Sequence, residues 1–208
     1  MRKWIFRILL VMFATPIAGL AIWYGVSFYP YVSQMEKMAG SANSSAQPVA
    51  DTLYKYAVVA ESEYGIRSYA TTQAYWSLVF SKNRTSTLSW HANNLLWYLA
   101  SHLHFNKKEI FGLWLSCSIE RCGNGLSSAA VKYYGKELAS LSVRELVGLV
   151  AMVKSPSAYK PGSERSEMRI EYILSKLQAH NKSLQPTHLR GTFFVLFSTK
   201  ISTTPVVG

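Results

Sequence analysis

Residues 8–34 of this chain contain no charged side chain, and residues 8–28 are almost continuously apolar. Crossing the hydrocarbon core of a membrane as a helix takes roughly 20 such residues. A cleaved signal peptide also combines a basic start with an apolar core, but that core is only about 7–15 residues long. The run therefore predicts a short stub and an uncleaved transmembrane anchor within residues 1–31.

The charges around the apolar run predict how the anchor is oriented. Arg2, Lys3 and Arg7 precede it, and Lys37 is the first cation after it. Cytoplasmic flanks of membrane helices carry an excess of lysine and arginine. We therefore expect a single-pass protein of a bacterial inner (cytoplasmic) membrane, with its N-terminus in the cytoplasm and the chain after Tyr29 outside, in the periplasm or its equivalent.

The remaining sequence divides into a linker, one domain and a tail. Residues 40–49 are small and polar, which predicts a flexible linker within residues 32–50. The length then leaves one domain over residues 51–180 and a tail over residues 181–208. An apolar patch in that tail, residues 193–197, is too short to cross a bilayer, so we expect it to pack on the domain or to lie at the lipid surface.

The domain is strongly basic. The chain has 22 lysines and arginines against 11 acidic residues, a net charge of +11. From Tyr64 onward 17 of these cations face 7 acids, so +10 of the charge lies there. Such an excess indicates an anionic partner. Nucleic acid is excluded for a domain outside the membrane, which leaves anionic lipid or a lipid-linked phosphate.

Local patterns predict a mainly α-helical domain. Asn106 with Glu109, and Ser142 with Glu145, have the spacing of capping boxes ahead of apolar runs. Two further helices follow from apolar side chains at helical spacing. These are Leu95, Leu99 and Leu103 in one, and Ile170, Ile173, Leu174 and Leu177 in the other.

The two cysteines and a histidine pair are weaker candidates for chemistry. Cys117 and Cys122 are too few for a zinc ribbon or a disulfide framework. They form either one small-loop disulfide, which an exported domain permits, or two buried thiols. His102 and His104 are two residues apart, so a helix does not place them on one face, and we expect no metal site there.

Five short motifs follow one another between residues 107 and 177. They are residues 107–115 (KKEIFGLWL), 125–136 (GLSSAAVKYYGK), 141–151 (LSVRELVGLVA), 155–161 (SPSAYKP), and Arg169 followed by the apolar residues of its helix. In order and spacing this stretch resembles the family 51 peptidoglycan glycosyltransferases. These occur as monofunctional membrane enzymes and as one module of class A penicillin-binding proteins. The resemblance implies a mainly α-helical, lysozyme-like glycosyltransferase domain behind one transmembrane helix.

The N-terminal half resembles the family more thinly. Residues 57–63 (AVVAESE) place Glu61 at the family's catalytic glutamate, with Ser62 where aspartate is usual and Glu63 as a rival. Residues 68–75 (SYATTQAY) keep Thr72 and Gln73 of the next family element, although only ten residues separate Glu61 from Thr72. The family has a much longer segment there, which covers the cleft.

The family's Arg-Lys-x-x-Glu element falls on residues 90–94, so its second acid is Asn94 in this chain. Trp90 and His91 stand where the family has cations. An amide accepts a hydrogen bond but cannot take a proton. We therefore expect low activity that rests on Glu61, and a higher rate if an acid is restored at position 94.

The resemblance implies an activity and its partners. A growing glycan is transferred onto the 4-hydroxyl of lipid II, and undecaprenyl pyrophosphate leaves. A base takes the hydroxyl proton and cations hold the pyrophosphate. The implied substrate contacts are Thr72, Gln73, His91, Lys132, Lys136 and Arg169. A divalent cation such as Mg or Mn is the only cofactor that the resemblance suggests, and other cell-wall synthesis proteins are further partners.

Two other functions stay open at this point. The first is a non-catalytic, membrane-anchored protein that holds lipid II or a cell-wall partner. The second is a decayed gene product without activity. An enzyme needs an acid that replaces the missing one in space, whereas a binding protein needs only the basic groups.

Overall fold

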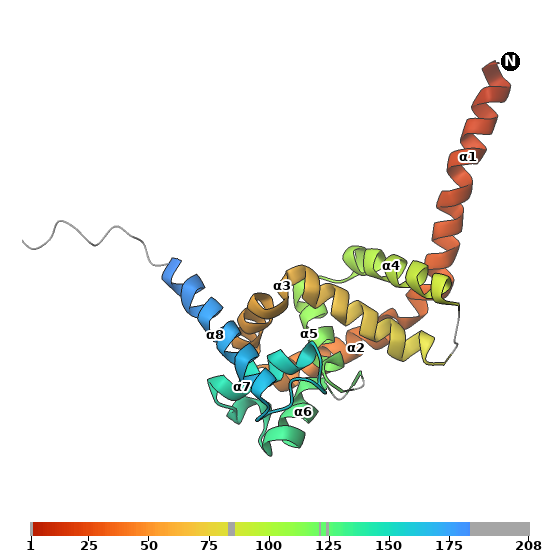
Figure 1. Cartoon of the computed structure of the whole chain (residues 1–208). Helices are drawn as coiled ribbons and strands as arrows, with labels where there is room; N and C mark the ends of the chain where they lie inside the picture. Colours follow the sequence, from red (N-terminus) through yellow and green to blue (C-terminus); the bar gives the residue numbers. More distant parts are fainter. Residues whose placement is uncertain (1, 83–85, 121, 124, 184–208) are drawn as a thin grey trace, which may run out of the picture.

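The computed structural model describes residues 2–82, 86–120, 122–123 and 125–183, and within them every regular element is helical. Helix α1 (Arg2–Trp23) stands clear of the rest of the molecule (Figure 1). It passes through a π-helical turn, η1 (Tyr24–Phe28), into α2 (Tyr29–Ala46). One segment, Val11–Ala46, is long and apolar enough to cross a membrane. Mainly helical architecture behind an apolar N-terminal helix was the expected fold class, and it is confirmed.

The expectation of a flexible linker within residues 32–50 is wrong over most of its length. Helix α2 continues to Ala46, and only a short turn separates it from α3 (Ala50–Tyr75). The small residues serve close packing here: at Gly112 of α5, an added Cβ would lie 2.5 Å from the Ala39 carbonyl oxygen and would also meet the Asn43 side chain. A composition of Gly, Ala and Ser fits a tight helix contact as well as a mobile chain.

Helix α3 is two helical segments joined at Ser62. This residue has φ 66° and ψ 164°, and its hydroxyl accepts a hydrogen bond from the Gly65 N–H at 3.2 Å. The helix then runs into a second π-helical turn, η2 (Trp76–Phe80). Helix α4 (Thr87–His104) packs against the second half of α3, with Thr71 opposite Ser101 and Tyr75 opposite Trp97, so the two run antiparallel.

The core is built around α5 (Lys107–Cys117), whose residues from Ile110 to Cys117 are all buried. Helices α2, α3 and α6 (Gly125–Tyr134) pack against it. The capping box of Asn106 and Glu109 is present at its start, as predicted. A buried helix of this length can hold the surrounding elements in fixed positions, because nearly every side chain contacts one of them.

The C-terminal part consists of a 3₁₀ turn (Leu138–Ser140), α7 (Val143–Val153) and α8 (Glu164–Ser183). The predicted capping box of Ser142 and Glu145 opens α7. A small apolar cluster joins α7 and α8 to the first half of α3, and it contains all four apolar residues predicted for α8. The apolar patch at residues 193–197 lies outside the described residues.

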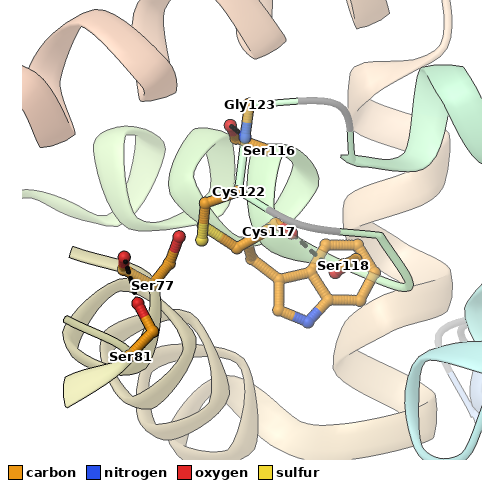
Figure 2. Close-up of a disulfide and its surroundings, with 8 residues drawn as sticks. Ser77, Ser81, Ser116, Cys117, Ser118, Cys122 and Gly123 are labelled. Atoms are coloured by element: carbon orange, nitrogen blue, oxygen red, sulfur yellow. Dashed lines mark hydrogen bonds between the residues drawn. A yellow bond between two sulfur atoms is a disulfide. The ribbon is translucent and has the colours of Figure 1, made fainter. Parts of the chain in front are cut away.

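The cysteines form a disulfide, which decides between the two states that the sequence allowed. Cys117 ends α5 and Cys122 lies in the loop after it (Figure 2). Ser116 holds the same loop, because its carbonyl oxygen and its hydroxyl both accept from the Gly123 N–H, at 3.0 and 3.1 Å. Within this loop Ile119 has φ 70°, a value that a β-branched residue rarely adopts.

Candidate active site

Glu61 lies at the end of the first segment of α3, immediately before the break at Ser62. Its Oε1 accepts a hydrogen bond from Nη2 of Arg169 on α8 at 2.6 Å. The pair is largely shielded, since 23% of the Glu61 side chain and 13% of the Arg169 side chain are exposed. Two residues that were predicted separately, as catalytic and substrate-binding, are therefore in direct contact.

Arg169 also meets the turn of residues 155–161. Its guanidinium carbon lies 5.4 Å from the centre of the Tyr159 ring, and its Nε is buried without a hydrogen-bond partner among the described residues. An open pocket beside it is lined by Tyr159, Arg165, Met168, Arg169 and Tyr172. Two cations at an open pocket can bind an anion, and arginine does so with paired N–H donors.

Tyr69 completes the surroundings of Glu61 on the side of the disulfide loop. Burial raises the pKa of its hydroxyl, a hydrogen bond with the backbone of Ile119 lowers it, and the charge of Glu61 raises it again. The hydroxyl thus stays protonated at neutral pH. Tyr69 was not predicted, because no spacing rule links it to a loop about fifty residues away.

Glu63, the rival of Glu61, faces other neighbours. Its carboxylate accepts from Lys107 Nζ at 2.9 Å and from the Tyr54 hydroxyl at 3.0 Å. The hydrogen bond from Lys107, and then that from Tyr54, hold the pKa of Glu63 below its ordinary value. This pair is more exposed than the other, at 53% for Glu63 and 72% for Lys107. It borders a separate cleft, with Arg67 and His102 among the lining residues.

The predicted phosphate-binding lysines do not join Arg169. Lys132 pairs with Glu120 at 2.7 Å, and the hydrogen bond between them raises the pKa of Lys132. Lys136 pairs with Glu145, also at 2.7 Å. Each of the three predicted cations thus has its own carboxylate, and the structure does not bring them together around one anion.

Asn94 lies on α4, a different helix from that of Glu61. Ring contacts between Tyr75 and Trp97, and between Phe80 and Trp90, place Asn94 opposite residues 75–80. That segment begins 14 residues after Glu61, beyond the break at Ser62. The Asn94 Oδ1 is buried and has no hydrogen-bond partner in the described part of the chain. Asn94 does not line the pocket beside Arg169, and its role beside Glu61 stays a prediction.

Three predicted substrate contacts remain: Thr72 and Gln73 on α3, and His91 on α4. Thr72 and Gln73 are half-buried near the end of α3, where their carbonyl oxygens accept from the Trp76 N–H. His91 is exposed on α4, with its ring 4.6 Å from that of Trp90. None of these three lines the pocket beside Arg169.

The residues at the candidate site do not fit a divalent cation. In residues 2–82, 86–120, 122–123 and 125–183, no three His, Cys, Asp or Glu side chains gather to hold a metal ion. The carboxylate of Glu61 faces a guanidinium, and the family's second acid is an amide here. We therefore assign no metal-dependent step to this chain.

Comparison with known families identifies the domain. The transglycosylase family matches residues 64–178, more than half of the chain. The chain belongs to the transglycosylase family. This confirms the resemblance to peptidoglycan glycosyltransferases that the motifs indicated. The matched segment begins three residues after Glu61, so the assignment of Glu61 rests on the shorter motif and on its contact with Arg169.

Curated relatives are similar over about half of the transglycosylase chain. Penicillin-binding protein 1A of Streptococcus oralis is 31% identical over 120 residues, which are 55% of this chain and 19% of the relative. The proteins of the same name from Neisseria cinerea and Streptococcus pneumoniae are 29% and 31% identical, over 54% and 52% of this chain. The matches span only 15% and 16% of those two relatives. No solved structure matches the chain significantly.

Proposed function

We propose that this transglycosylase-family chain is a divergent peptidoglycan glycosyltransferase of low activity that polymerises lipid II at the outer face of the cytoplasmic membrane. The 4-hydroxyl of lipid II attacks the anomeric carbon at the lipid-linked end of the growing glycan. A C–O bond forms there as the bond to undecaprenyl pyrophosphate breaks, and a base takes the hydroxyl proton. The observation that carries the proposal is the shielded contact of Glu61 with Arg169, beside the motif turn that contains Tyr159.

In this proposal Glu61 is the base and Arg169 holds the pyrophosphate. Before substrate binds, the Arg169 guanidinium donates a hydrogen bond to Oε1 of Glu61, one of the two oxygens that would accept the proton. A pyrophosphate in the pocket beside Arg169 and Arg165 competes for the guanidinium, because phosphate oxygens form strong charge-assisted hydrogen bonds with arginine. Substrate arrival then frees the carboxylate, which couples binding to activation of the base.

A second candidate function is a non-catalytic protein that binds lipid II and holds it at the membrane. Asn94 favours it, because the family's second acid is an amide in this chain. Arginines at the pocket are sufficient for this role. The two candidates share a ligand and differ in turnover.

Binding of labelled lipid II to the full chain in nanodiscs tests the shared part of the proposal. Arg169→Gln should weaken binding at least about tenfold, which corresponds to about 1.4 kcal/mol. Arg144→Gln is the matched control, since Arg144 is an exposed arginine paired with Glu167 and Glu171. Undecaprenyl pyrophosphate should compete with lipid II, and high salt should reduce the effect of Arg169→Gln. Equal binding by the parent and Arg169→Gln would place the ligand elsewhere.

A further inference from the structure

A second cleft, the Glu63 cleft, is lined by charged and aromatic side chains that include Tyr54, Glu63, Tyr64, Arg67, His102 and Lys107. They come from both segments of α3, from α4 and from the start of α5. The cleft has a volume of about 360 Å³, within the range of roughly 300–1,000 Å³ for small-molecule sites. It shares no lining residue with the pocket beside Arg169, and the proposed glycosyltransferase function makes no use of it.

An ion pair at the Glu63 cleft links α3 to α5. Lys107 Nζ lies 2.9 Å from each carboxylate oxygen of Glu63, and the Tyr54 hydroxyl donates to Oε1 at 3.0 Å. Both charged side chains are more than half exposed, and exposed pairs of this kind contribute little to stability. A ligand can therefore replace either partner at little cost in folding free energy.

Arg67 supplies a second cation at the Glu63 cleft. Its Nη1 donates to the Ser101 carbonyl oxygen at 2.9 Å, and Nη1 and Nη2 both donate to that of Phe105 at 3.4 Å. These bonds hold the guanidinium against the end of α4 and leave its Nε–H without a partner among the described residues. Because the acceptors are neutral carbonyl groups, the positive charge of Arg67 still acts on a ligand in the cleft.

The charges of the Glu63 cleft favour a ligand that carries both signs. His102 is neutral at pH 7, because burial and then the charge of Arg67 lower the pKa of its imidazole. Glu63 repels a simple anion, whereas Arg67 and Lys107 repel a simple cation. A ligand with one ammonium and at least one carboxylate leaves no charge unpaired. Its ammonium pairs with Glu63, and its carboxylate pairs with Lys107 and Arg67.

Aromatic rings lie beside the charged groups of the Glu63 cleft. The Tyr64 and Tyr98 rings meet edge to face with centroids 5.6 Å apart, and His102 meets Tyr98 in the same way at 4.8 Å. Aromatic faces attract ammonium groups and pack against aliphatic carbons. The rings therefore suit the carbon atoms of a small zwitterion as well as its ammonium.

We propose that the Glu63 cleft binds an α-amino acid group, with its ammonium and its carboxylate on the same carbon atom. Glu63 and Lys107 are in contact, so the two ligand charges that replace their pairing must also lie close together. In the complex the ammonium donates to the Glu63 carboxylate, while Lys107 and Arg67 donate to the ligand carboxylate. Neither Glu61 nor Arg169 takes part, so the proposal does not depend on whether the chain binds or polymerises lipid II.

Saturation-transfer NMR titrations of the full chain in nanodiscs test the proposal with small probes. Glutamate carries both groups, glutarate lacks the ammonium, and propylamine lacks the carboxylates. We expect glutamate to bind with a dissociation constant in the millimolar range or below. Glutarate and propylamine should bind at least about tenfold more weakly, because each loses a charge-assisted contact. Equal binding of glutarate and glutamate would overturn the proposal in favour of a plain anion site.

Variants of the ion pair locate the bound glutamate. Glu63→Gln and Lys107→Gln should each weaken glutamate binding at least about tenfold. Lys132→Gln is the matched control, because Lys132 is an exposed lysine paired with Glu120 outside the Glu63 cleft, and it should bind glutamate like the parent. Circular dichroism checks that each variant keeps its helical content. Unchanged binding by folded Glu63→Gln, or no glutamate binding by the folded parent, would contradict the proposal.

Peptide probes distinguish the two sources of such a group. γ-Glutamyl-alanine keeps the α-ammonium and the α-carboxylate free, as a residue linked through its side chain does. Binding at least as tight as that of glutamate would identify a peptide as the ligand, and weaker binding would identify a free amino acid. Alanyl-glutamate, whose ammonium belongs to the preceding residue, should bind at least about tenfold more weakly than glutamate. Equal binding of these two would show that the charges need not share a carbon atom and would overturn the proposal.

Discussion

Ser62 is the residue that gives Glu61 and Glu63 different neighbours. Its positive φ breaks α3 between them, so Glu61 contacts Arg169 on α8 while Glu63 contacts Lys107 on α5. The hydroxyl of Ser62 then accepts the Gly65 N–H at the start of the second helical segment. A carboxylate in a shielded pair with Arg169 has different surroundings from one in an exposed ion pair, although the sequence places them two residues apart.

The sequence predicted part of the candidate site. Glu61 and Arg169 followed from family motifs more than a hundred residues apart, and the structure joins them. Lys132 and Lys136 were grouped with Arg169 from their motifs, and in the structure each pairs with a carboxylate of its own, because a motif gives the order of residues but not which carboxylate each cation contacts. Asn94 was assigned from the order of the family motifs, and motif order does not show how α4 lies relative to Glu61.

At position 94 the structure reverses the expectation that an acid would raise the rate. The Asn94 Oδ1 is buried, and the facing residues 75–80 contain no cation. Asn94→Glu should therefore destabilise the full chain in detergent by about 1–3 kcal/mol, the range for a buried polar group left unsatisfied. Asn94→Leu is the control and should preserve the melting temperature. A faster or more stable Asn94→Glu protein would mean that α4 faces the cleft.

At the scale of helices, the contact between α2 and α5 makes the segment after the anchor part of the domain. Gly112→Ala should destabilise the chain by about 1–3 kcal/mol, because its Cβ would collide with the Ala39 carbonyl and the Asn43 side chain. Gly40→Ala on the open side of α2 should instead stabilise it by up to about 1 kcal/mol. Denaturant unfolding in detergent measures both. Tolerance of Gly112→Ala would restore the interpretation of this segment as a linker.

The start of α7 carries a pH-dependent contribution to stability. The hydrogen bond from Lys136, and then those from Ser142, lower the pKa of Glu145 from 4.5 to about 2. Because the folded pKa is depressed, this contribution is complete above about pH 4.5 and is lost as the pH falls toward about 2.

Glu145→Gln should therefore lower the melting temperature at neutral pH, and the difference from the parent should shrink as the medium is acidified through that window. Glutamine retains the capping geometry, so the difference isolates the charge. Lys136→Gln should also lower the melting temperature at neutral pH, but by less than Glu145→Gln does. Parallel melting curves for the parent and Glu145→Gln across this range would contradict the assignment.

Much of the helical architecture could be predicted from local sequence. Both capping boxes and the apolar face of α8 are as expected, because they depend on residues within two turns of each other. Two features were not predictable in this way. Residues 40–46 are helical because α5 provides a surface for them, and the leucines of α4 are exposed although their spacing resembles that of a core-facing helix.

For the whole molecule, the orientation across the membrane is a prediction that reporters can test. A fusion after Gly208 should give active alkaline phosphatase and non-fluorescent green fluorescent protein, since three cations hold the N-terminus in the cytoplasm. The disulfide agrees with an outward-facing domain, because disulfides persist in oxidising compartments. A fluorescent fusion, or a mature chain shortened by about thirty residues, would contradict an outward-facing domain on an uncleaved anchor.

Turnover tests the central claim most directly. The measurement is polymerisation of labelled lipid II by the purified full chain and by Glu61→Gln, with Glu63→Gln as the matched control. General-base catalysis contributes about 10²–10⁴-fold, so Glu61→Gln should lose nearly all of a slow but measurable rate. Glu63→Gln should retain most of it, because the Glu63 carboxylate is held by Lys107 and Tyr54 instead of Arg169. Equal rates in the parent and Glu61→Gln would contradict the account, and no glycan from the parent while lipid II still binds would favour the non-catalytic candidate.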